Sequence, residues 1–121
     1  MALLVTAGIL LVHDRVRWPI ARDHCLSIGG RLLEPRTQGE VTEAVSMLVG
    51  DVDKIWIGGY HFYAPPEGGY VWDTDGSAVD VNQFWKENEA YSTLDFMLVN
   101  TRSQFTVRSH NKEYPFACKL N

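Results

Sequence analysis

The chain has 121 residues, of which 45% are hydrophobic, 12% aromatic and 21% charged, and this is typical of one packed globular domain over residues 1–121. The formal net charge is −4, and the lysines and arginines are scattered along the chain. Because a polyanion is bound by clustered positive charge, this pattern argues against nucleic acid as a partner.

The chain opens with the apolar run "MALLVTAGILLV" (1–12). This run is shorter than the about 20 residues that a membrane helix needs, and it lacks the basic start of a signal peptide. Its valine, isoleucine and leucine content predicts a buried first strand and no membrane span. If part of this strand is exposed, it could pair edge to edge with a second copy of the chain and form a homodimer.

Two helices are predicted in the first half of the chain. Residues 17–30 have an apolar face, a proline near the first turn and two glycines at the end. A second helix is predicted to begin at a capping box formed by Thr37 and Glu40. Apolar residues at helical spacing continue this helix to a predicted end near Gly50.

The pattern changes after residue 54 to short runs rich in β-branched and aromatic residues, separated by Gly, Pro, Asn and Ser, which predicts strands and turns. These runs are "IWIGGY", "YVWDT", "FMLVNT", "FTVRS" and "PFACKL". Two helices followed by a sheet give an α+β fold. Between the strands lies a long, turn-rich segment, and long ordered loops in compact domains usually bind ligands.

The stretch "DTDGSAVD" (73–80) has a partial likeness to a calcium-binding EF-hand loop. The D-x-D-G spacing is too short for that loop, and no glutamate stands at its twelfth position. We therefore expect a hairpin turn at Asp75 and Gly76 instead.

The two cysteines, Cys25 and Cys118, are far apart in the sequence. Zinc motifs need local cysteine pairs, which the chain lacks. Composition alone leaves three states open: a disulfide, two separate buried thiols, or a single nucleophile.

Several motifs in order resemble the short form of the C-type lectin-like domain, over residues from about 9 to 120. They are a helix cysteine followed by "GGRL", a capped second helix, "WIGG" (56–59), "EGGYVWDTDG" (67–76), "FW" (84–85) and a closing "PFAC" (115–118). The resemblance implies two helices packed on antiparallel sheets with a long ligand-binding loop region. It also implies a Cys25–Cys118 disulfide, and hence a secreted or extracellular setting. Trp56 would lie in the central core strand, where Gly58 would let neighbouring backbone approach.

The resemblance also locates the family's principal calcium site. In calcium-dependent members, oxygen-bearing residues follow the tryptophan that corresponds to Trp85 and recur on the next strand. Here residues 89–91 read Glu-Ala-Tyr, Leu94 holds a later glutamate position, and residues 105–107 read Phe-Thr-Val. Only Glu89 keeps its carboxylate, whereas calcium takes about six to eight oxygen ligands. We therefore expect a degenerate site and no metal or other cofactor.

Two further positions depart from the family. Family members usually have an inner disulfide where this chain has Phe96 and His110. We expect these rings to pack on each other, with the imidazole hydrogen-bonded if it is buried, so that His110 is structural and not a ligand.

No enzyme chemistry stands out, because the four histidines show no paired spacing and no nucleophile is placed beside a base. The function that we expect instead is the binding of another molecule. The main hypothesis is an extracellular lectin that binds a carbohydrate or glycoconjugate without a principal-site calcium ion. The alternatives are a calcium-independent protein-recognition domain and a calcium-dependent lectin with a relocated ion site. A glycan reader should have a concave acidic and aromatic pocket, and a protein reader a broad apolar patch. The candidate ligand-binding residues are Tyr63, Glu87, Asn88, Glu89, Tyr91 and Asp95.

Overall fold

The computed structural model describes residues 3–6, 8–62, 69–91 and 93–120. Within them are the helices α1 (Trp18–Ser27) and α2 (Gln38–Ser46) and a short 3-10 turn, η1 (Glu89–Tyr91). The strands are β1 (Leu3–Thr6), β2 (Ile9–Val16), β3 (Gly30–Leu32), β4 (Lys54–Phe62), β5 (Gly69–Trp72), β6 (Phe96–Asn100), β7 (Phe105–Arg108) and β8 (Tyr114–Leu120). The predicted α+β class is confirmed, and each predicted run in the second half forms a strand.

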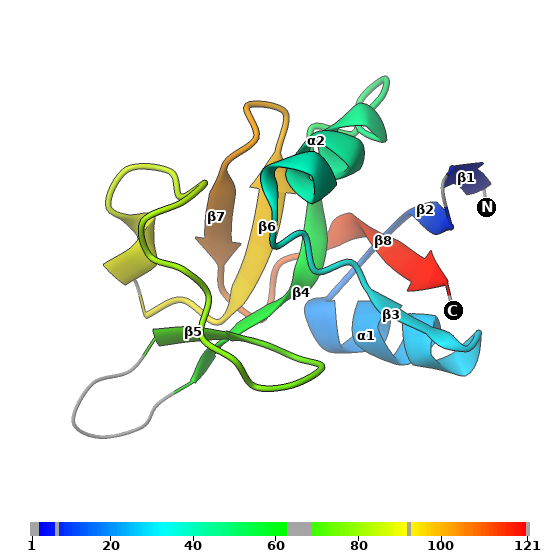
Figure 1. Cartoon of the computed structure of the whole chain (residues 1–121). Coiled ribbons are helices and arrows are strands. Elements are labelled where there is room, and N and C mark those ends of the chain that lie inside the picture. The colour runs from blue at the N-terminus through cyan, green and yellow to red at the C-terminus, as the bar shows by residue number, and fades with distance from the viewer. Residues whose placement is uncertain (1–2, 7, 63–68, 92, 121) are drawn as a thin grey trace.

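The described strands form one eight-stranded sheet with the order β1-β2-β8-β4-β6-β7, to which β3 adds beside β8 and β5 beside β4. The pairings are antiparallel except between β4 and β8, which run parallel where Trp56 meets Phe116. The sheet is therefore mixed and not purely antiparallel. In Figure 1 both chain ends lie on the side of β1, β2 and β8, and β5 leads away toward the long loop.

The opening run forms two strands, so the prediction of one first strand is wrong. β1 and β2 pair as an antiparallel hairpin, with Thr6 opposite Ile9. Gly8 has a φ of 76°, a left-handed conformation that glycine adopts without steric cost, and the chain turns back there. The first part of β2 is buried, and β1 is an edge of the sheet.

α1 confirms the first predicted helix but is shorter at its end. Pro19 stands in its first turn, and Gly29 follows it with a φ of 81°. Gly30 belongs to β3, where a Cβ atom would collide with the backbone of Lys119. The second glycine is thus needed for close strand pairing, and it does not end the helix.

α2 begins at the predicted capping box. Glu40 N donates to Thr37 Oγ1 and Thr37 N donates to Glu40 Oε1, both at 3.2 Å. The helix ends at Ser46 and not near Gly50, because Met47 N and Leu48 N donate to carbonyls three residues earlier, which tightens the last turn.

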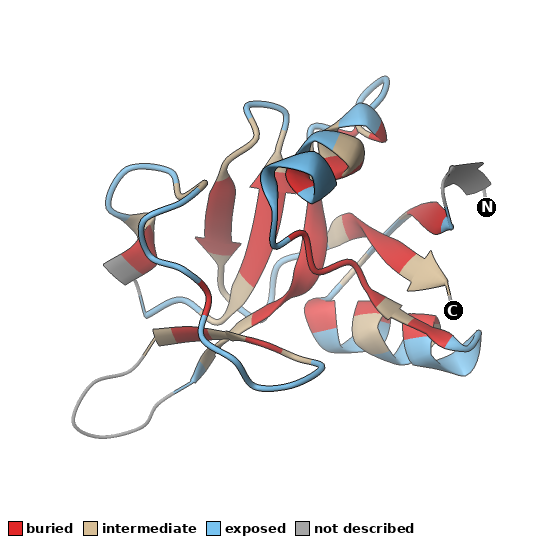
Figure 2. Cartoon of the chain, in the orientation of Figure 1, coloured by how far each residue is buried: buried red, intermediate tan, exposed pale blue. Residues whose placement is uncertain are grey.

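The core has two clusters, one on each face of the sheet. α2 packs in the cluster that contains Ile55 and Ile57, and α1 packs in the cluster that contains Trp56. Because successive side chains of a strand point to opposite faces, β4 serves both clusters. Figure 2 shows buried residues along the central strands. Trp56 is fully buried, which confirms its predicted place in the core, and its Nε1 donates to Val16 O at 2.8 Å.

Gly58 allows a close approach, but of a side chain. A Cβ atom at this position would lie 2.8 Å from Cγ of Glu34. The prediction of a close approach was therefore right, and the prediction that the neighbour is backbone was wrong.

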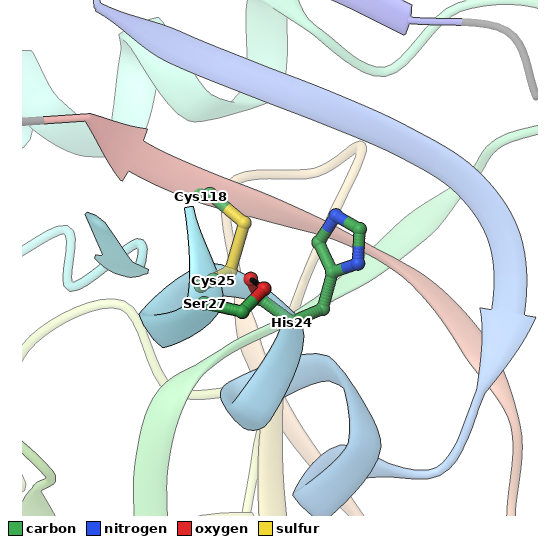
Figure 3. Close-up of a disulfide and its surroundings, with 4 residues drawn as sticks. All are labelled: His24, Cys25, Ser27 and Cys118. Carbon is green, nitrogen blue, oxygen red and sulfur yellow. Dashed lines mark hydrogen bonds between the residues drawn. A yellow bond between two sulfur atoms is a disulfide. The ribbon is translucent and has the colours of Figure 1, made fainter. Parts of the chain in front are cut away.

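A disulfide joins Cys25 of α1 to Cys118 of β8, with 5.4 Å between the two Cα atoms (Figure 3). The bridge confirms the pairing that the resemblance implied and excludes the two alternatives of free thiols or a cysteine nucleophile. Both residues are fully buried, so the bond ties the first helix to the last strand inside the core. Among the described residues, no helix has the length and apolar character to cross a membrane.

Candidate functional site

The long loop begins with a tight turn after β5. Gly76 has a φ of 70°, its N donates to Trp72 O at 2.8 Å, and Val71 forms an antiparallel bridge with Ala78. The predicted hairpin turn at Asp75 and Gly76 is therefore confirmed. The turn sends the following residues back along β5 toward the sheet.

The loop is then held against β7. Phe105 N donates to Phe84 O at 2.6 Å, and Lys86 N donates to Phe105 O at 3.0 Å. Trp85 forms a parallel bridge with Phe105. These bonds place the next turn, η1, beside β7. This placement brings Glu89 of η1 close to Arg108 at the end of β7.

Glu89 forms an ion pair with Arg108 at the end of β7. Arg108 Nη1 lies 3.5 Å from Glu89 Oε1 and also donates to Val107 O at 2.7 Å. Both side chains are partly buried, which strengthens the attraction over that of a surface pair. Glu89 Oε2 is itself buried and has no hydrogen-bond partner among the described residues. Arg108 was not predicted as a site residue, although it directly follows the strand triplet of residues 105–107.

The residues present do not fit a calcium ion in the principal site. Thr106 is buried, and its hydroxyl oxygen is the only side-chain oxygen in the strand triplet. Glu89 already faces the guanidinium of Arg108, and a cation beside a carboxylate opposes the binding of another cation. In the described part of the chain, no three His, Cys, Asp or Glu residues are grouped as metal ligands.

Asp95 is paired with His110, so the expected packing of His110 on Phe96 is wrong. Asp95 Oδ2 accepts a hydrogen bond from His110 N at 2.8 Å and lies 3.0 Å from Nδ1. The His110 side chain is 74% exposed, because it lies in a surface turn and can reach the carboxylate there. Phe96 stacks instead on Trp18, with ring centroids 4.4 Å apart.

The other predicted ligand-binding residues are only partly brought together. Glu87 and Asn88 are exposed beside Glu89, and Asn88 has a φ of 67°. Arg108 connects the two regions, because it contacts Glu89 and is the strand partner of Phe96, the neighbour of Asp95. The backbone of Tyr91 lies in η1, whereas Tyr63 lies outside the described residues.

A second polar cluster, which the sequence analysis did not identify, surrounds Arg36. Glu34 is only 8% exposed and accepts hydrogen bonds from Arg36 Nη2 at 2.6 Å, Thr74 N at 2.9 Å and Thr74 Oγ1 at 2.7 Å. Arg36 Nη1 donates to Asp75 Oδ2 at 3.1 Å and to Ser77 Oγ at 3.0 Å. The cluster joins the segment before α2 to the turn after β5. A glutamate within the apolar stretch "RLLEP" was the available signal.

The electrostatics of this cluster favour the charged forms of Arg36 and Asp75. Hydrogen bonds from Arg36 and then Ser77 hold the pKa of the Asp75 carboxyl well below its usual range. Burial lowers the pKa of Arg36, but the bonds to Asp75 and Glu34 outweigh this and raise it overall. The guanidinium also stands 5.4 Å over the ring of Trp72.

Three hollows of the described surface are lined by residues other than Glu87, Asn88, Glu89 and Asp95. A cavity of about 190 Å³ between Arg36 and Phe84 adjoins a more open hollow bordered by the start of α2. A third hollow of about 240 Å³ is lined mainly by Trp18, Tyr60 and Phe96, with the Arg22–Asp73 ion pair at 2.7 Å beside it.

Comparison with known proteins gives one curated relative and many similar structures. No protein-family model matches the chain. Ladderlectin of Oncorhynchus mykiss is 36% identical over 83 residues, which are 66% of this chain and 42% of that protein. The chain therefore spans less than half the length of this relative.

Three solved structures superpose over nearly the whole chain. Human lithostathine has a TM-score of 0.76 at 18% identity and covers 98% of this chain and 88% of its own. A calcium-independent type II antifreeze protein has a TM-score of 0.74 at 19% identity, and the match covers 98% of this chain and 95% of that protein's chain. The carbohydrate-recognition domain of human scavenger receptor C-type lectin has a TM-score of 0.72 at 17% identity, and the match covers 96% of this chain and 93% of that domain's chain. At these identities the likeness establishes the fold.

Proposed function

We propose that this chain, a C-type lectin-like recognition domain, acts outside the cell and binds a carbohydrate or glycoconjugate without a calcium ion in its principal site. The fold on which the proposal rests is the one predicted from the sequence motifs and shared with the solved structures above. The observation that carries the proposal is the ion pair between Glu89 and Arg108. In this pair an internal cation neutralises the one carboxylate that the family's calcium site would retain.

Ligand contacts would come from the exposed edge of the loop beside this pair. Glu87 and Asn88 are exposed, and carboxylate and amide oxygens accept hydrogen bonds from sugar hydroxyls. The side chain of Arg108 is partly exposed and could donate to the same ligand. Tyr63 and Tyr91 are proposed as stacking residues on the resemblance alone.

Two features support an extracellular, non-enzymatic role. The buried Cys25–Cys118 bond suits an oxidising compartment, because disulfides persist there and are rare in the cytosol. The same bond leaves no thiol nucleophile. His110, which contacts Asp95, is paired with that carboxylate at an exposed position.

A binding screen tests the proposal. The purified chain is applied to a glycan array with calcium and again with a chelator, and hits are measured by calorimetry under both conditions. We expect the affinity for a bound glycan to be equal in the two conditions and to fall in a Glu87→Ala, Asn88→Ala double variant. Lys112→Ala, a change at an exposed residue on another loop, is the control. Binding that disappears on chelation would contradict the proposal.

Thermal denaturation separates the calcium alternatives. A ligand that binds only the folded state raises the melting temperature. We expect no rise on adding millimolar calcium, whereas a relocated ion site would produce one that chelation reverses.

Protein recognition is the second candidate, and exposed apolar side chains favour it. Phe62, Val81 and Leu94 are 50%, 47% and 41% exposed and come from the loop region or its borders. Two results together would favour this candidate. The glycan array would show no binding with calcium or with chelator, and the chain would bind a protein partner with an affinity that Leu94→Ser lowers.

A homodimer is a further proposal, through pairing of two β1 strands at the sheet edge. Light scattering on a size-exclusion column measures the mass directly. A proline at Val5 should convert a dimer to monomer, because proline removes a ladder hydrogen bond.

A further inference from the structure

We propose that the cavity between Arg36 and Phe84 is a second binding site, which takes a single neutral sugar ring. It shares no residue with the loop edge assigned above, so the inference does not depend on which ligand that edge binds.

The cavity has a size and lining that suit one ring. Its volume of about 190 Å³ is below the about 300 to 1,000 Å³ of sites for drug-sized ligands. Trp72, Val79 and Phe105 are buried and line it with apolar surface. Arg36, Gln83 and Phe84 line both this cavity and the adjoining hollow at the start of α2. A ring in the cavity would therefore keep an open path for the rest of a glycan.

Phe84 is held in a conformation that a phenylalanine rarely adopts. Its φ is 69°, in the left-handed region where a side chain is strained. The hydrogen bond from Phe105 N to Phe84 O, and the one from Lys86 N to Phe105 O two residues later, keep the backbone in place. Glycine would fit this backbone without strain, whereas the phenylalanine ring packs against the core cluster that contains Phe105. The half-buried ring, edge-on to Phe105 at 5.5 Å, gives the cavity an aromatic wall on which a sugar could stack.

The charges around the cavity favour a neutral ligand over an anion. The single cation of the lining, Arg36, is already bonded to Glu34 and Asp75, which do not line the cavity themselves, and Asp80 is the one carboxylate among the lining residues. This local excess of negative charge repels an anionic ligand. The exposed amide of Gln83 offers donors and an acceptor, which match the mixed character of sugar hydroxyls.

The side chain of Arg36 is already ordered before a ligand binds in the cavity. Its guanidinium is fixed by Glu34, Thr74, Asp75 and Ser77 before a ligand arrives, while about a third of the side chain remains exposed. Side chains that are already ordered lower the entropic cost of binding. The rigid cluster thus gives this cavity a fixed polar wall opposite the aromatic one.

The test is a titration of the ¹⁵N-labelled whole chain, followed by NMR. The probes are the methyl glycosides of glucose, galactose, mannose and N-acetylglucosamine, with glucose 6-phosphate as the anionic comparison. We expect at least one glycoside to shift the amide signals of Ser77 and Gln83 and the indole signal of Trp72. The same sugar with a phosphate should bind more weakly.

Two variants of lining residues and one control variant at a neighbouring residue complete the test. Gln83→Ala should weaken binding about three- to tenfold, as expected for one lost hydrogen bond. Phe84→Gly should weaken it similarly while the chain stays folded, because glycine accepts the positive φ. Asn82→Ala changes an exposed neighbour that does not line the cavity, and it should leave the affinity unchanged.

The results separate this site from the loop edge. Shifts confined to Glu87 and Asn88, or no shifts with any glycoside, would overturn the cavity site. Cavity shifts that survive both Gln83→Ala and Phe84→Gly would also overturn it, as would equally strong binding of glucose 6-phosphate. Cavity shifts that both variants weaken would support it even if the loop edge binds no sugar.

Discussion

Replacing Glu34 with alanine should cost more stability than replacing an exposed charged residue. The carboxylate is only 8% exposed and accepts three hydrogen bonds. They come from Arg36 and from the backbone and hydroxyl of Thr74, so the change removes the Glu34–Thr74 part of the link between the segment before α2 and the turn after β5, whereas the bonds from Arg36 to Asp75 and Ser77 remain.

The magnitude follows from the exposure of each donor. A hydrogen bond to a charged group contributes about 1.5 to 3 kcal/mol when it is well buried. Arg36 is about a third exposed and keeps Asp75 as a partner, so its share falls to about 1 kcal/mol. Thr74 is exposed and can turn to water, which limits its two bonds to about 1 to 2 kcal/mol together. We expect a loss of about 2 to 3 kcal/mol, or about 10 °C in melting temperature.

Urea denaturation of three variants measures this loss. Glu34→Gln keeps an acceptor oxygen for Thr74 and should lose about half as much as Glu34→Ala. Glu113→Ala, at an exposed position, should stay within about 0.5 kcal/mol of the parent. A double-mutant cycle with Arg36→Ala should give a coupling of about 1 kcal/mol. If Glu34→Ala loses no more than Glu113→Ala, the carboxylate does not organise this region and the reasoning fails.

Three further changes test other parts of the structure. Thr37→Ala should cost about 1 kcal/mol in thermal denaturation, because it removes the cap of α2, and a neutral result would show that the cap is not needed. Replacing both Cys25 and Cys118 with alanine should cost about 2 to 5 kcal/mol in urea, since the bridge closes a loop of 93 residues; an unchanged midpoint would refute this. The pKa of Asp75 is lowered in the folded state by Arg36 and Ser77. Its contribution is therefore complete above the unfolded pKa of about 3.9 and is lost as pH falls toward the lower folded value. The stability difference between the parent and Asp75→Asn should shrink between pH 6 and pH 2, and a constant difference would contradict the assignment.

The secondary structure was largely predictable because it depends on near neighbours. The capping box of Thr37 and Glu40 satisfies backbone donors within one helical turn, and it is visible as a four-residue motif. The turn at Asp75 and Gly76 likewise depends on what these residues can adopt locally. The end of α2 was not predictable in this way, because apolar spacing continues past the residue at which tighter hydrogen bonds end the helix.

The candidate sites were decided by tertiary structure. Glu89 was singled out by its position in a motif, but its partner Arg108 became visible only when β7 lay beside η1. The Glu34 cluster likewise joins residues about forty positions apart. His110 was expected against Phe96 and found beside Asp95.

By itself the sequence determined the α+β class and the positions of both helices and five strands. The tertiary structure alone decided which charges neutralise one another and where the surface is hollow. The physical reason is range: a cap or a turn is stabilised by atoms a few residues apart, whereas an ion pair or a cavity exists only after strands from distant parts of the chain are in register.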